Sequence, residues 1–211
     1  AKWQSKLYNE SNVRTNSWLI IEAATALARM GDNSQQGNII KSLSKLNPAL
    51  MNDHQLLALL RTYQLTFTRM GKPSAENAQA VVTELNSLFP HKSNFANREL
   101  SKLLLYLNAP KAVSRTVQLM LTTAASQNIL LEGHILQRND NYAKAATRLA
   151  TSTPNSNQIA FAFMLRSIKS GWTETDRVIY FSWFPQAKSW QGGNSYSKFI
   201  NNTCREALKH V

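Results

Sequence analysis

Aromatic and small polar residues gather in one stretch near the C-terminus, residues 183–199, with the sequence WFPQAKSWQGGNSYSKF. Its candidate binding residues are three aromatic side chains around a Gly-Gly-Asn-Ser turn: Trp183, Trp190, Gly192, Gly193, Asn194, Ser195 and Tyr196. Backbone N–H groups at the start of a helix can hold an anion, and exposed tryptophan rings can stack on a sugar, a base or a porphyrin edge. An enzyme with a site near residues 183–195 predicts a pocket in which polar groups converge beside these rings.

The same stretch also has a structural interpretation. A glycine pair permits backbone angles that other residues avoid, and Asn194 or Ser195 can cap a following helix. The aromatic side chains would then pack around the turn as a local core. The stretch matches neither a phosphate loop nor a dinucleotide fingerprint, because no strand precedes it. The sequence leaves both interpretations open.

Two adjacent pairs of opposite charges are further candidates, Arg98 with Glu99 and Asp176 with Arg177. A glycosidase needs two carboxylic acids that face one another, whereas acidic residues at helix starts are ordinary caps. Thr173 and Asp176 have the spacing of a capping box, in which the acidic side chain reaches back to the first N–H group. We therefore predict that these residues anchor helices through charged hydrogen bonds and that the chain has no catalytic residue.

The histidines and the single cysteine show no metal-site or nucleophile pattern. None of the four histidines has the spacing of a metal site, and surface or capping roles are expected for His54, His91, His134 and His210. For His134 an axial haem ligand is the alternative. Cys204 lies on an apolar stripe, which favours a small buried side chain. The sequence predicts no metal site.

The sequence that carries these residues is dominated by helical periodicity. The apolar stripes include Leu56, Leu59, Leu60, Tyr63 and Phe67, and a second one of Ile200, Thr203, Cys204, Ala207 and Leu208. Helices are expected to begin near residues 16, 34, 52, 74, 97, 110, 141, 156, 174 and 195. Helix pairs then recur at roughly 40 residues, the length of HEAT or armadillo repeats. We predict an all-α fold, a HEAT/armadillo-like solenoid of helical hairpins over residues 1–211, with an irregular helical bundle as the alternative.

Local signals set the ends of these helices. Gly31 and Gly71 follow helical runs as helix-stopping glycines do. Pro110 is placed to open a helix. Phe184 and Pro185 are expected to end the helix that begins at Thr173, because the residue before a proline resists helix.

The composition is basic, with a formal net charge of +12 and few charged residues, 17%. Residues 1–100 hold 11 Lys/Arg and 7 Asp/Glu, and residues 101–211 hold 13 and 5. This balance favours anionic partners: nucleic acid, acidic polysaccharide or an acidic protein. No apolar run reaches membrane-spanning length, so no membrane span is expected.

Four segments together resemble one family: NRELSKLLLYLNAP (97–110), LQRNDNYAKAATRLA (136–150), QIAFAFMLRSIKSGWTETDRVIYFSWF (158–184) and QGGNSYSKFINN (191–202). They are similar to the HEAT-like helical region of large secreted planctomycete and verrucomicrobial proteins, over about residues 89–211 and only loosely before them. In those proteins the region commonly precedes a c-type cytochrome domain. The resemblance implies a periplasmic or secreted location and a helical scaffold beside a redox domain.

Three functions follow as hypotheses. The first is a non-catalytic helical-repeat scaffold, a segment of a larger extracytoplasmic protein or complex, which interacts with a c-type cytochrome domain. Because the haem motif CxxCH is not in this chain, haem c is expected only on an attached or partner domain. The second is a polyanion-binding module for acidic polysaccharide or nucleic acid, and the third is the enzyme described above.

Overall fold

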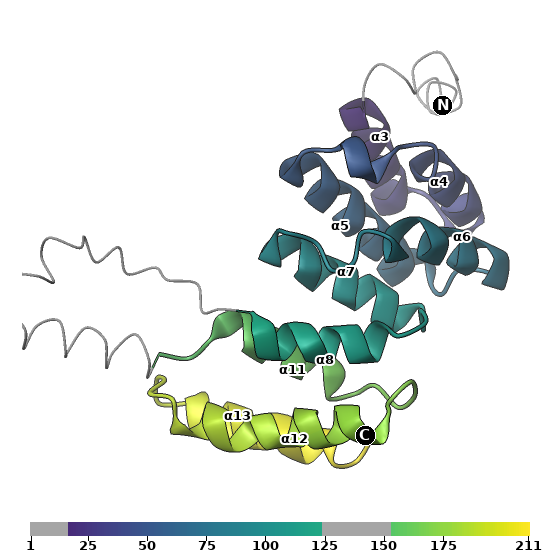
Figure 1. The fold of residues 1–211 in the computed structure, drawn as a ribbon. Helices are drawn as coiled ribbons and strands as arrows, with labels where there is room; N and C mark the ends of the chain where they lie inside the picture. Colours follow the sequence, from purple (N-terminus) through teal and green to yellow (C-terminus); the bar gives the residue numbers. More distant parts are fainter. Residues whose placement is uncertain (1–16, 124–152) are drawn as a thin grey trace, which may run out of the picture. The chain divides into compact units, whose positions relative to one another are not determined.

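The computed structural model describes residues 17–123 and 153–211, which belong to two compact units, Ala1–Ala109 and Pro110–Val211 (Figure 1). All regular elements of the described residues are helices, so the all-α prediction is confirmed. Among these helices, none has both the length and the apolar character needed to cross a membrane.

The first unit is built from helices of 8 to 18 residues joined by short turns and two 3-10 helices. Its described elements are α3 (Ser17–Met30), η1 (Asn33–Gln35), α4 (Gln36–Leu43), η2 (Pro48–Leu50), α5 (Asp53–Met70), α6 (Ala75–Asn86) and α7 (Asn94–Tyr106).

Polar caps and one glycine fix the ends of these helices. The side chain of Asn52 accepts the Gln55 N–H group and Gln55 reaches back to the Asn52 N–H group, so α5 begins with a capping box. It ends at Gly71, whose φ of +85° is a conformation that side-chain-bearing residues rarely adopt. The side chain of Ser74 caps α6 and that of Ser93 caps α7.

Helix α5 lies at the centre of the first unit. It packs against α3 and α7, while α4 packs on α3 and α5, and α6 packs on α4 and α7. Its buried face includes Leu56, Leu59, Leu60, Tyr63 and Phe67, the stripe expected from the sequence. The hydroxyls of Thr25 and Thr62 join α3 to α5 at 2.9 Å. This packing places α5 directly beside α7.

The second unit contains four described helices: α8 (Ala112–Thr122), α11 (Ser156–Leu165), α12 (Glu174–Ser189) and α13 (Tyr196–Ala207). Helix α8 packs against α11 and α12, and α13 packs against both α11 and α12 (Figure 1). Tyr180, buried in this core, donates a hydrogen bond from its hydroxyl to the carbonyl of Ala162 at 2.9 Å.

Most helix starts lie within three residues of the expected positions, and the start expected near residue 141 falls outside the described residues. Helix α8 begins at Ala112 rather than Pro110, because Lys111 has a φ of +58° and stands outside the helix. Leu208 follows α13 and is 67% exposed, so its predicted place on the buried stripe is wrong.

The predicted end of the helix at Phe184 is also wrong. Helix α12 continues through Pro185 to Ser189. A proline inside a helix removes one backbone hydrogen bond and favours a bend. Here the buried residues Trp183, Phe184 and Ala187 lie on both sides of it, so burial of the inner face holds the helix together across an exposed proline.

Candidate functional site

The aromatic residues of the 183–199 stretch pack on one another and on α11. Trp183 is only 2% exposed, and its Nε1–H group donates to Oε1 of Gln158 at 2.9 Å. Its ring meets Phe184 edge-on with centroids 5.2 Å apart and Trp190 with centroids 5.9 Å apart. Trp183 is therefore a core residue of the second unit, whereas Trp190 and Tyr196 are half-buried and Phe199 is exposed.

The glycine pair is explained by sterics and not by backbone angles. Gly71 and Gly171 are the described glycines with positive φ, so the conformational role predicted for Gly192 and Gly193 is wrong. A Cβ atom on Gly192 would lie 2.2 Å from Cγ of Tyr196, whereas one on Gly193 would meet open space. Tyr196 is held in this position because its hydroxyl donates to the carbonyl of Ala187 at 2.7 Å.

The predicted side-chain cap of α13 is wrong as well. Ser195 occupies the N-cap position with helical backbone angles and makes no capping hydrogen bond, and the exposed Asn194 makes none either within the described residues. Instead the carbonyl of Gly193 accepts the Tyr196 N–H group at 2.8 Å. The turn is thus set by the fit of the Tyr196 ring against Gly192.

We expect Gly192→Ala to destabilise the protein by about 1–3 kcal/mol, because the added methyl group displaces an anchored tyrosine ring. Gly193→Ala is the matched control and should change the unfolding free energy by less than about 0.5 kcal/mol. Urea unfolding followed by circular dichroism measures both. Equal effects of the two substitutions would contradict the steric explanation.

Asp176 joins α12 to α8. Its Oδ2 accepts the Thr173 N–H group at 3.1 Å in the capping box and the Ser114 hydroxyl at 2.7 Å. Burial raises the pKa of this carboxyl, but the hydrogen bonds from Ser114 and Thr173 outweigh burial and the pKa lies below its ordinary value. Arg177, the neighbour of Asp176, is exposed.

Glu99 likewise joins α7 to α5. Its Oε2 accepts Nε2 of Gln64 at 2.7 Å and pairs with Nζ of Lys102 at 3.0 Å. Arg98 beside it is half-buried. Both carboxylates that the sequence singled out therefore connect helices of their own unit.

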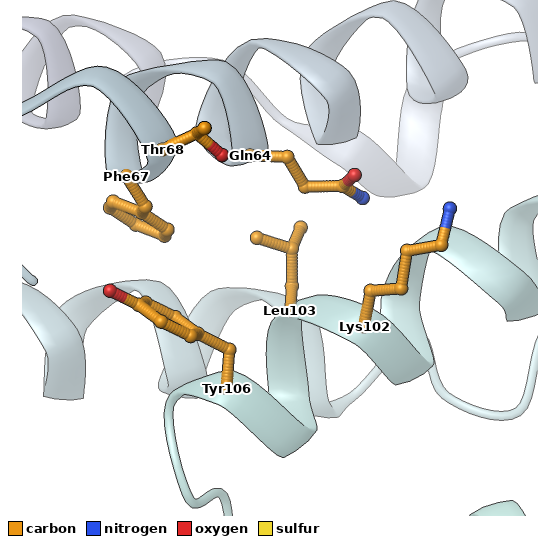
Figure 2. A pocket seen from close by; sticks show the side chains of 6 residues that line it. All are labelled: Gln64, Phe67, Thr68, Lys102, Leu103 and Tyr106. Atoms are coloured by element: carbon orange, nitrogen blue, oxygen red, sulfur yellow. The ribbon is translucent and has the colours of Figure 1, made fainter. Parts of the chain in front are cut away.

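A groove lies between α5 and α7. It measures about 220 Å³ and is lined by Gln64, Phe67, Thr68, Lys102, Leu103 and Tyr106. Gln64, Phe67 and Thr68 belong to α5, and Lys102, Leu103 and Tyr106 belong to α7. In Figure 2 the two rings lie at one end of the groove, Lys102 lies at the other, and Leu103 lies in the middle. We call it the α5–α7 groove.

One end of the α5–α7 groove is aromatic and the other is polar. The rings of Phe67 and Tyr106 stack with centroids 5.9 Å apart and an interplanar angle of 20°. Phe67 is buried, whereas Tyr106 is 44% exposed and offers its ring to solvent. At the polar end the Gln64 amide and the Lys102 ammonium group both contact Glu99.

The α5–α7 groove was not predicted from the sequence. Gln64 and Thr68 lie four residues apart beside the buried stripe of α5, and Lys102 and Tyr106 repeat this spacing on α7. The polar and aromatic residues that border an apolar stripe in two helices were a signal that the sequence offered. The sequence did not show that α5 and α7 are neighbours, because α6 lies between them in the chain.

The outer face of α13 is cationic. Positions 198, 201, 202 and 205 lie on one face of α13, and position 209 lies in the turn that follows the helix. The exposed residues at these positions are Lys198, Asn201, Asn202, Arg205 and Lys209, which we call the α13 basic stripe. Within the described residues no carboxylate lies within ion-pair distance of Lys198, Arg205 or Lys209. The opposite face of α13 buries Ile200, Thr203 and Ala207.

The acidic residues of the second unit do little to neutralise this stripe. Its described residues include nine Lys/Arg and only three Asp/Glu. Of the three acids, Asp176 is buried and hydrogen-bonded, and Glu206 pairs with Nε of Arg166 at 2.5 Å. Glu174 is the remaining exposed one.

A buried carboxyl group lies elsewhere in the first unit. Oε2 of Glu84 on α6 accepts the hydroxyl of Tyr63 on α5 at 3.1 Å, and Oε1 is buried without a hydrogen bond from the described residues. Burial raises the pKa of Glu84 to about 7, against the opposing effect of the Tyr63 hydroxyl that donates to it and of the Ser44 hydroxyl. Burial and the Glu84 charge together raise the pKa of Tyr63 well above its ordinary value.

The histidines and the cysteine are dispersed. His54 and His210 are exposed, and Nδ1 of the half-buried His91 accepts the Ser93 N–H group at 3.1 Å. His134 lies outside the described residues, and Cys204 is half-buried. Across residues 17–123 and 153–211 no three His, Cys, Asp or Glu side chains come together as a metal site would require.

Comparisons with protein-family models, with curated proteins and with solved structures find no match to this chain.

Proposed function

We propose that this chain is a helical-repeat interaction module that binds an acidic partner protein through the α13 basic stripe. The observation that carries this proposal is a group of three exposed cationic side chains, two on α13 and one in the turn after it, with no carboxylate of the described residues within ion-pair distance. Such a group attracts an acidic surface over several ångströms and orients it before contact. The mechanism is binding, with no bond chemistry.

The packing of the first unit supports the repeat interpretation. Helices α3, α5 and α7 follow one another side by side, and the intervening helices α4 and α6 pack against each other and against this row. Successive helical hairpins in a solenoid place their helices in alternate layers in the same way. We propose a HEAT-like solenoid segment on this basis.

We further propose that the partner is a c-type cytochrome domain of an extracytoplasmic assembly, attached in a longer parent chain or present as a separate subunit. The resemblance of residues 89–211 to the helical region beside such domains supports this choice, as does the net charge of +12. Haem c would then reside on the partner, and the helical module would hold the redox domain in place.

Charge reversal tests the role of the α13 basic stripe. A triple variant, Lys198→Glu, Arg205→Glu and Lys209→Glu, should weaken binding of fluorescent poly-L-glutamate, a simple acidic polypeptide, by at least about tenfold at low salt. The matched control reverses three exposed lysines of the first unit with the same change in net charge: Lys41→Glu, Lys45→Glu and Lys72→Glu. We expect the control variant to bind poly-L-glutamate less than about threefold more weakly than the wild type does. Equal losses would show that net charge and not this face attracts the polypeptide.

A polyanion-binding module is the second candidate, because the amides of Asn201 and Asn202 interleave with the cations of the stripe and can donate to sulfate or phosphate oxygens. The same two variants distinguish it when heparin or single-stranded DNA replaces poly-L-glutamate. This candidate predicts that one of these polymers binds more tightly than poly-L-glutamate, with an affinity that falls steeply with salt.

A further inference from the structure

The α5–α7 groove has the size of one aromatic ring. A cavity of about 150 Å³ lined by apolar side chains is large enough to hold benzene, and this groove measures about 220 Å³. Pockets for whole small-molecule ligands are larger, typically about 300–1,000 Å³, and enclose most of the ligand surface. The groove is open, since Thr68, Lys102 and Tyr106 are all exposed. A free small molecule would bury too little of its surface here to bind tightly.

A side chain anchored from a partner chain does not have this limitation, because contacts around the groove add to the anchor. The exposed ring of Tyr106 offers a stacking surface beside Phe67, and Leu103 lies next to the ring pair on the side toward Lys102 (Figure 2). Aromatic rings gain from stacking beyond the apolar area that they bury. The aromatic end therefore fits a ring.

The rim of the groove fits polar and negative groups. Within the described residues, the hydroxyls of Thr68 and Tyr106 make no hydrogen bond and remain able to donate to or accept from a ligand. Lys102 has a side chain 45% exposed, and the exposed Arg61 lies one turn before Gln64 on the same face of α5. Glu99 is the acidic group at this end, and its side chain is only 13% exposed behind Gln64 and Lys102. The outermost charges are thus positive.

We propose that the α5–α7 groove binds one aromatic side chain with a polar edge, tryptophan or tyrosine, carried by an acidic segment of a partner protein. The ring stacks on Tyr106 and covers Leu103, its N–H or hydroxyl group reaches Thr68 or Gln64, and flanking carboxylates face Lys102 and Arg61. This site lies in the first unit and does not depend on the α13 basic stripe.

The test uses the full 211-residue chain and short blocked peptides, with binding followed by NMR of the Leu103 methyl groups and the Tyr106 ring. The acidic peptide Asp-Asp-Trp-Asp-Asp should give saturable shifts at both residues. The peptide with alanine in place of tryptophan should bind at least about tenfold more weakly, and Lys-Lys-Trp-Lys-Lys at least about fivefold more weakly. Shifts confined to residues outside the groove, or equal binding of the alanine peptide, would overturn the proposal. N-acetyltryptophanamide binding as tightly as the acidic peptide would indicate a small-molecule site and would also overturn it.

Variants of exposed residues complete the test. Tyr106→Ala should weaken binding of the acidic peptide by at least about tenfold. Phe95→Ala, which removes a 64% exposed ring elsewhere on α7, should change this binding by less than about twofold. Thr68→Trp places a bulky side chain over the groove from an exposed position and should block binding without any loss of a packed ring. Undiminished binding by both Tyr106→Ala and Thr68→Trp would exclude the groove. The triple reversal of the α13 basic stripe should leave this peptide bound, so failure here and failure of the proposed function are distinguishable.

Discussion

Trp183→Ala is expected to cost about 3–5 kcal/mol of unfolding free energy, because it removes a large buried ring and leaves a cavity between α11 and α12. It also leaves Oε1 of Gln158 without its hydrogen-bond donor. Trp183→Phe keeps most of the ring and should cost less than half as much. Urea unfolding followed by circular dichroism measures the three proteins on one scale.

Trp190→Ala is the control from the same aromatic cluster. Trp190 is half-buried and touches Trp183 edge-on, so its truncation should cost about 1–2 kcal/mol. If Trp183→Ala lost no more stability than Trp190→Ala, Trp183 would not be a core residue. The interpretation of the stretch as an exposed stacking site would then regain support.

Glu84→Gln is expected to stabilise the protein at pH 8 and to remove part of its pH dependence. The pKa of Glu84 in the folded protein is about 7, above the ordinary value of 4.5. The folded state therefore binds more protons than the unfolded state between these values, and the contribution of Glu84 to stability is fully present below pH 4.5 and is lost as pH rises to about 7. One pKa unit is worth about 1.4 kcal/mol, so the whole shift is worth on the order of 2 kcal/mol after allowance for solvent screening of a partly exposed group.

The measurement is the urea-unfolding free energy at several pH values between 4.5 and 8. Wild type should lose stability across this range, and Glu84→Gln should lose less, because the amide keeps a neutral acceptor for the Tyr63 hydroxyl. Glu22→Gln removes an exposed carboxylate from α3 and should leave the wild-type slope unchanged. A Glu84→Gln slope equal to that of wild type would show that Glu84 is ionised in the folded protein throughout the range.

The helices of this protein were predictable from local signals. The apolar stripe of α5 is buried as its spacing indicates, and Gly71 ends that helix with the positive φ that favours glycine. Thr173 and Asp176 form the capping box that their spacing predicts. These features depend on residues within a few positions of one another, which a sequence shows directly.

Two of the failures depend on how side chains pack in three dimensions. Helix α12 passes through Pro185 because its flanking residues are buried against other helices. Gly192 is required by the ring of Tyr196, which is held in turn by the carbonyl of Ala187. Local propensity predicted a helix break at Pro185 and a special backbone angle at Gly192, and tertiary packing overrode both.

The candidate surfaces depend still more on packing. Glu84 is an unremarkable helical glutamate in the sequence, and only the meeting of α5 and α6 places it against Tyr63. The α5–α7 groove needs two helices separated by a third in the chain. The charge count alone did not locate the α13 basic stripe, although Lys198 and Arg205 have a spacing that places them on one side of a helix.

The most direct test of the proposed function is purification of the chain from its native source, with intact mass and a visible spectrum recorded across the size-exclusion peak at low and at high salt. The proposal predicts a haem Soret band that co-elutes with these residues at low salt. The intact mass shows whether the haem lies on a longer parent chain or on a separate subunit, and a separate subunit should dissociate at high salt. A colourless monomer of 23.8 kDa at low salt would contradict a cytochrome-bound interaction module.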